Sequence, residues 1–86
     1  MILQYDTDTK FLTIQLRNET SVLRSSYSND ITLDLSMSGS VVGIEVFQPS
    51  TSDWRLREIL SLYQIDFQIA DALLKLENHK YIFQDI

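Results

Sequence analysis

Two carboxylates stand in otherwise apolar, strand-like runs of this chain, Asp34 in "ITLDLS" and Glu45 in "VVGIEVF". Two neighbouring acids could divide the roles of general acid and general base in hydrolysis, or together bind a hard cation. Gly43 would lie between them and leave space for a ligand or for the backbone of a partner. In the alternative interpretation, which we favour, both acids belong to the solvated face of a sheet, and Glu45 pairs with Arg17 or another cation.

The other components of a catalytic or metal site are scarce in this sequence. The chain contains no cysteine and one histidine, His79. This histidine would lie at the end of a predicted helix, where a cation complements the helix dipole. There is no glycine-rich phosphate loop and no nucleophile motif. The sequence therefore predicts no catalytic residue, no cofactor and no metal ligand.

Strands must position these acids, because apolar and polar residues mostly alternate from Leu3 to Phe47. Three runs place nine aliphatic side chains on one face: Leu12, Ile14, Leu16, Ile31, Leu33, Leu35, Val42, Ile44 and Val46. Asp34 and Glu45 then fall on the opposite face. The stretch "RNETSVLRSSYSN" is poorly patterned and is interpreted as an edge strand or as partly loop.

The register of these strands follows from keeping the aliphatic side chains together, since a shift by one residue exchanges the two faces. A two-residue turn at Ser38-Gly39 predicts the pairs Leu35 with Val42, Leu33 with Ile44, and Ile31 with Val46. Asp34 is then opposite Gly43 and is a diagonal neighbour of Glu45, about 7 to 8 Å away by backbone. An earlier hairpin, with its tip at Asp8-Thr9, pairs Tyr5 with Leu12 and Leu3 with Ile14.

Helices are predicted after Pro49, which lacks the amide donor that a strand needs. Ser50 and Asp53 resemble a capping box, and apolar residues at helical spacing predict one amphipathic helix. The residues of that stripe are Leu56, Ile59, Leu60 and Tyr63.

A second helix is predicted from Asp66 to about His79, with an apolar arc wide enough to contact more than its own sheet. The alternation of "YQIDFQIA" would instead favour a strand over residues 63–69, but the helix formers that follow favour the helix. The end of the chain, "KYIFQDI", is interpreted as a terminal strand or as a docking tail.

These elements predict one α+β domain over residues 1–86, because 86 residues leave room for a single core. Residues 1–48 would form an antiparallel β-meander of four or five strands. Residues 50–80 would contribute two helices packed on one face of the sheet, and residues 81–86 a short tail or strand.

The charge and hydropathy of the chain limit its partners. A formal net charge of −5 repels the phosphate backbone, so we expect no nucleic-acid partner. No apolar run approaches the roughly 18 residues that cross a bilayer, and "MILQYD" lacks the features of a signal peptide. We therefore expect a cytoplasmic protein without a membrane partner.

The first half of the chain resembles a family of short bacterial and archaeal proteins, the domain-of-unknown-function family 2283. The likeness covers about residues 3–47 and is carried by "YDTDTKFLTIQL" and, more specifically, by "ITLDLSMSGSVVGIEV". It implies a small antiparallel meander followed by helix, and no activity. It also implies an antitoxin-like binding role, since some similar proteins lie beside small toxin-like partners. The turns are less acidic here than is typical, and the segment after Pro49 is longer.

The surplus of apolar surface points to a binding function. Phe11 and Phe47 fall on the face away from the aliphatic residues, where large aromatic side chains need cover from a helix, the tail or another chain. Trp54 could anchor a binding surface, although such a residue more often folds back over the sheet.

We therefore expect a non-enzymatic interaction protein that forms a homo-oligomer or binds a small protein partner. The alternative is a small hydrolase or metal-dependent enzyme that uses Asp34 and Glu45. The candidate interaction surface comprises Phe11, Arg17, Asp34, Gly43, Glu45, Phe47 and Trp54.

Overall fold

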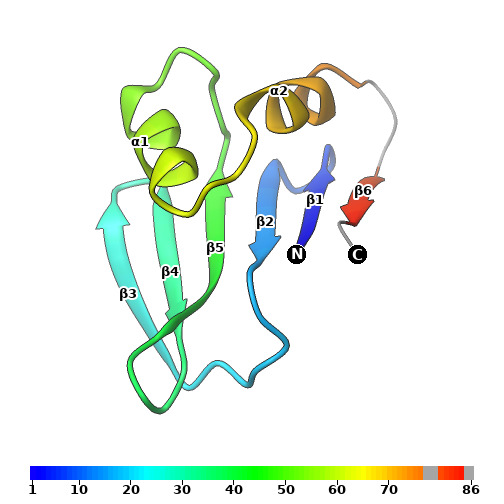
Figure 1. Ribbon diagram of the computed structural model, residues 1–86. Helices are drawn as coiled ribbons and strands as arrows, with labels where there is room; N and C mark the ends of the chain where they lie inside the picture. The colour runs from blue at the N-terminus through cyan, green and yellow to red at the C-terminus, as the bar shows by residue number, and fades with distance from the viewer. Residues whose placement is uncertain (77–79, 85–86) are drawn as a thin grey trace.

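Six strands form one antiparallel sheet in the order β3-β4-β5-β2-β1-β6 (Figure 1). The structure is a computed structural model that describes residues 1–76 and 80–84. The strands are β1 (Ile2–Asp6), β2 (Phe11–Gln15), β3 (Leu23–Ser28), β4 (Ile31–Leu35), β5 (Val41–Phe47) and β6 (Lys80–Gln84). Five strands followed by two helices confirm the predicted α+β class, and the segment that was interpreted as strand or tail supplies the sixth strand.

The strand order departs from a plain meander at one point, because β2 pairs with β5 and not with β3. Leu12 pairs with Val46, and Ile14 with Ile44. This order brings the strongly apolar strands β2 and β5 together at the centre of the sheet. The serine-rich β3 lies at an edge, where its exposed side chains leave the core intact.

Both predicted hairpins are present. In the first, Tyr5 pairs with Leu12 and Leu3 with Ile14, as predicted. In the second, the predicted pairs Ile31 with Val46, and Leu33 with Ile44, are confirmed.

The predicted pairing of Leu35 with Val42 is wrong, because Leu35 pairs with Val41 across a β-bulge. The turn is also wider than the predicted two residues. The amide of Ser36 donates to the carbonyl of Ser40, and the amide of Gly39 donates to the carbonyl of Ser36, both at 2.9 Å. Gly39 adopts a φ of 86°, which glycine accepts without a steric penalty. Val42 is nevertheless buried, as its predicted place among the aliphatic residues requires, and Val41 is partly buried against the core.

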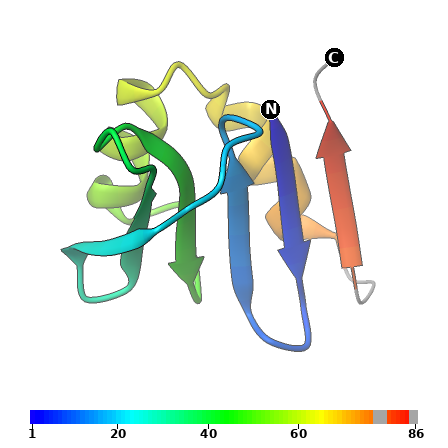
Figure 2. The same ribbon diagram turned by 90° about the horizontal axis from the view of Figure 1, so that it is seen from below.

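Two helices, α1 (Trp54–Leu62) and α2 (Phe67–Lys75), cover one face of the sheet (Figures 1 and 2). The carboxylate of Asp53 accepts the amide of Arg55 at 2.9 Å and caps α1. The predicted capping box is therefore wrong: the hydroxyl of Ser50 accepts the amide of Ser52 within its own turn. Asp66 caps α2 in the same way as Asp53 caps α1, by accepting the amide of Gln68.

The helix predicted from Asp66 is confirmed at its start but ends earlier than predicted, at Lys75. Leu76 is extended, which lets the chain return so that β6 can pair with β1. His79 lies outside the described residues. The alternating residues 63–69 do not form a strand. Ile65 lies in the connection between the helices, with its side chain buried, and Phe67 begins α2.

The core lies between the helices and the sheet. Leu56, Ile59, Leu60, Ala70 and Leu73 from the helices share one buried cluster with side chains from the strands. The strand members of that cluster are Leu3, Leu12, Ile14, Ile31, Ile44 and Val46. The prediction that the helices pack on the aliphatic face is thus confirmed. None of the described helices is long and apolar enough to pass through a bilayer.

Candidate functional site

The face of the sheet opposite the helices, here called the outer face, has no helix over it in the described part of the chain (Figure 2). The part of this face that carries the candidate residues is formed by alternate residues of four strands, β2 to β5. These residues are Phe11, Thr13, Gln15, Arg24, Ser26, Thr32, Asp34, Gly43, Glu45 and Phe47. Six of the seven predicted surface residues, all except Trp54, lie on this face or at its rim.

Asp34 and Glu45 are joined on the outer face by one guanidinium, that of Arg24. The Nε of Arg24 lies 3.3 Å from Asp34 Oδ1, and its Nη2 lies 3.1 Å from Glu45 Oε2. These three residues, the Arg24 cluster, come from three adjacent strands, β3, β4 and β5. Arg24 was not among the predicted surface residues, because apolar and polar residues do not alternate clearly in its strand.

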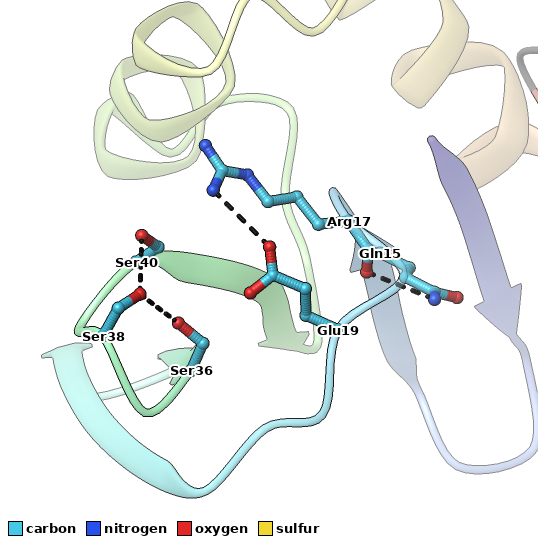
Figure 3. A network of polar contacts seen from close by, with 6 residues as sticks. All are labelled: Gln15, Arg17, Glu19, Ser36, Ser38 and Ser40. Atoms are coloured by element: carbon cyan, nitrogen blue, oxygen red, sulfur yellow. Dashed lines mark hydrogen bonds and ion pairs between the residues drawn. The ribbon is translucent and has the colours of Figure 1, made fainter.

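Arg17, the cation proposed for Glu45, instead contacts Glu19 at 3.8 Å (Figure 3). It lies in the connection between β2 and β3, where the amides of Leu16 and Arg17 both donate to the carbonyl of Val42. This connection runs beside β5, and so Arg17 lies at the rim of the outer face and not above Glu45.

Gly43 makes room for Asp34 itself. A Cβ atom at Gly43 would lie 3.3 Å from Asp34 Oδ2 and 3.4 Å from the carbonyl oxygen of Ile14. Asp34 is opposite Gly43, as predicted, and its carboxylate lies across the space that a side chain would fill. The space expected for a ligand or a partner backbone is thus already occupied by this chain.

The carboxylate of Asp34 depends on Arg24. The Asp34 side chain is only 16% exposed, whereas that of Arg24 is 69% exposed. Among the described residues, Asp34 Oδ1 is buried and accepts no hydrogen bond, so the ion pair with Arg24 is its polar contact. Removing the cation would leave a mostly buried charge without compensation.

A depression of about 230 Å³ lies beside the Arg24 cluster. Its lining includes Thr13, Arg17, Glu19, Asp34 and Gly43. Near it the turn from β4 to β5 carries a chain of serine hydroxyls, Ser36 to Ser38 at 2.9 Å and Ser38 to Ser40 at 3.3 Å (Figure 3). Across residues 1–76 and 80–84, no group of three or more His, Cys, Asp or Glu could hold a metal ion.

The two aromatic side chains of the outer face form a cross-strand pair. Phe11 is opposite Phe47, with ring centroids 5.1 Å apart and ring planes inclined by 47°. Both residues are still largely exposed, Phe11 at 40% and Phe47 at 37%. Contact between the rings therefore covers them only in part, and no described helix lies over them.

Trp54 is separate from the other candidate residues because it begins α1, on the opposite side of the sheet. It is 61% exposed, so the arrangement in which it folds back over the sheet does not occur. The guanidinium of Arg55 lies 5.1 Å from the ring centre, in a cation–π contact at the helix surface.

A comparison with protein families gives one match: the model for a protein of unknown function (DUF2283) fits residues 2–50. The matched segment contains β1 to β5 and therefore all the outer-face residues named above. It ends before α1. No curated protein and no solved structure matches the chain significantly.

Proposed function

The chain belongs to the DUF2283 family, whose description assigns no activity. From the surfaces of the molecule we propose that this protein is a non-enzymatic protein-interaction module. The binding surface is the outer face of the sheet. The residues that contact the partner are Phe11 and Phe47, bordered by the Arg24 cluster.

The exposed aromatic pair is the observation that carries this proposal. Aromatic side chains are enriched among the residues that dominate binding energy in protein interfaces, and they are usually surrounded by polar groups. Phe11 and Phe47 are held on two central strands and against each other. Most of the conformational entropy that these two side chains would lose on binding is therefore already lost in the free protein.

The Arg24 cluster fits a polar border better than it fits a reactive centre. Both carboxylates contact the same guanidinium, which favours a structural role for them over the divided acid and base roles of the enzyme alternative. The border contains one cation and two anions, and each of these charged groups keeps an ion-pair partner within the chain.

The partner is a protein, either a second copy of this chain or a small protein of another kind. The antitoxin-like role that the family resemblance implies is one form of such binding. The proposal needs no cofactor.

The test compares two variants in pull-downs from the source cell and in light scattering over a wide concentration range. Phe11→Ser/Phe47→Ser should lose the partner, or any self-association that occurs through the outer face. Trp54→Ser/Leu62→Ser, which removes two exposed apolar side chains from the helical side, should retain them. Circular dichroism checks that both variants fold. Equal binding by the two variants, or a wild-type protein that stays monomeric and captures nothing, would refute the proposal.

A further inference from the structure

β3 lies at one edge of the sheet and pairs only with β4 within the described residues. An edge strand presents unpaired backbone donors and acceptors along its free side, and these can pair with another extended chain. The chain that could pair with β3 depends on which of its backbone groups point to the free side.

The hydrogen bonds of the sheet show which groups are free. The amide of Phe47 donates to the carbonyl of Asp30 at 2.8 Å. Because successive residues of an antiparallel strand direct their backbone groups to opposite neighbours, those of Asp34 point to β5 and those of Leu33 point to β3. Leu33 is opposite Ser25, so the groups of Ser25 point inward. The backbone groups of Arg24 and Ser26 therefore point to the free side.

Several of the features by which proteins prevent edge pairing are absent from this edge. The strand "LRSSYS" contains no proline and no lysine. Its one charged side chain, Arg24, is directed onto the outer face and held by two carboxylates. One β-bulge, between Ser26 and Ser28, limits the regular part to Leu23–Ser26.

The strand is also complementary to itself. An antiparallel copy, related by a two-fold axis at Ser25, would place Arg24 opposite Ser26 of the second copy. Each Arg24 could then exchange both backbone hydrogen bonds with that serine. On the helical face, Leu23 is 60% exposed, whereas Tyr27 packs against the core. The same axis brings Leu23 of each copy beside Tyr27 of the other, so that the exposed leucine of each copy is covered.

We propose that the free edge of β3 pairs with β3 of a second copy, so that two sheets join into one continuous sheet with a two-fold axis at Ser25. This inference rests on the proposed function only in that the chain acts by binding protein. It uses a different surface, and the dimer would leave both outer faces open to a partner.

A single cysteine tests the axis, because the natural chain has none. Directly opposed residues that do not exchange hydrogen bonds have Cα atoms about 4.5 Å apart, within the range that a disulfide spans. Ser25→Cys should give a disulfide-linked dimer under mild oxidation, at least tenfold faster than Ser38→Cys in the exposed turn. Equal rates for the two variants would overturn the proposed pairing.

Light scattering of the natural chain, which has no cysteine, provides the second measurement. The natural chain should have twice its monomer mass at high concentration. Ser26→Pro, which removes an outward donor, and Leu23→Lys should both be monomeric, whereas Met37→Lys in the turn should remain dimeric. A monomer at every concentration would refute the inference.

The two proposals can fail separately. Phe11→Ser/Phe47→Ser should leave the crosslinking of Ser25→Cys unchanged, because the aromatic pair lies away from the β3 edge. If the outer face binds a partner while Ser25→Cys does not crosslink, the edge inference fails and the proposed function stands.

Discussion

Arg24 and Tyr27, three positions apart on β3, contact groups on opposite faces of the sheet. Arg24 contacts the acids of β4 and β5 on the outer face. Tyr27 donates its hydroxyl hydrogen to the carboxylate of Glu58 in α1. The strand buries few side chains of its own. Its position therefore depends on backbone pairing with β4, on these two polar contacts and on the packing of Tyr27 against the core.

Removing Arg24 should destabilise the fold through Asp34. We expect Arg24→Gln to lower the free energy of unfolding by about 1 kcal/mol, because a mostly buried carboxylate loses its partner while the guanidinium itself is largely solvated. The loss should shrink when Asp34→Asn is present. Urea unfolding measures it, with Arg17→Gln as the matched control. Equal losses for the two arginine variants would contradict the role of the Arg24 cluster.

Loss of the Tyr27 hydroxyl should loosen the edge strand. Tyr27→Phe removes one hydrogen bond worth about 0.5–1 kcal/mol, so amide exchange at Ser25 and Leu33 should become roughly two- to fivefold faster. Exchange at Ile44, in the centre of the sheet, should not change. Hydrogen exchange followed by NMR measures both. If Ile44 accelerates equally, the contact stabilises the whole fold and not the edge.

Substituting Gly43 should conflict with Asp34. We expect Gly43→Ala to cost about 1 kcal/mol, because the new methyl group meets a carboxylate and a backbone carbonyl. The Asp34→Ser background should reduce that cost. Gly39→Ala is the control: its cost arises from a positive φ of 86° in open space and should be the same in both backgrounds. Thermal and urea unfolding of each glycine variant, in the natural chain and in the Asp34→Ser background, relative to that background alone, provide the comparison.

The start of α1 can be tested directly. Asp53→Ala should lower the free energy of unfolding by about 1 kcal/mol, because it removes the side chain that accepts the amide of Arg55. Ser50→Ala should leave stability nearly unchanged, because its hydroxyl contacts only its own turn. If Ser50→Ala lowered the free energy of unfolding more than Asp53→Ala does in urea unfolding, Ser50 and not Asp53 would be the capping residue.

The faces of the strands could be predicted from sequence because alternation and burial act on each strand alone. Ile31, Leu33, Ile44 and Val46 pair as the pattern requires. Asp34 and Glu45 share the other face for the same reason. The aromatic pair of Phe11 and Phe47 was also placed on that face, but their direct contact depends on β2 lying next to β5.

The order of the strands could not be predicted, because alternation shows which side of a strand is buried and not which strand lies beside it. Arg24 shows the same limit. A plain two-residue turn at Asn29-Asp30 would place Ser25 opposite Asp34. The bulge between Ser26 and Ser28 shifts the strand by one residue and brings Arg24 there instead. No local pattern in the sequence marks that bulge.

The ladder between β1 and β6 has a kinetic consequence. Ile2 pairs with Gln84, so this ladder closes the longest loop in the sheet, and such long-range contacts slow folding. A circularly permuted chain, in which β6 leads into β1 through a short turn, would convert this pairing into a local hairpin. We expect the permuted chain to reach the same fold faster, with β1 and β6 forming early instead of last.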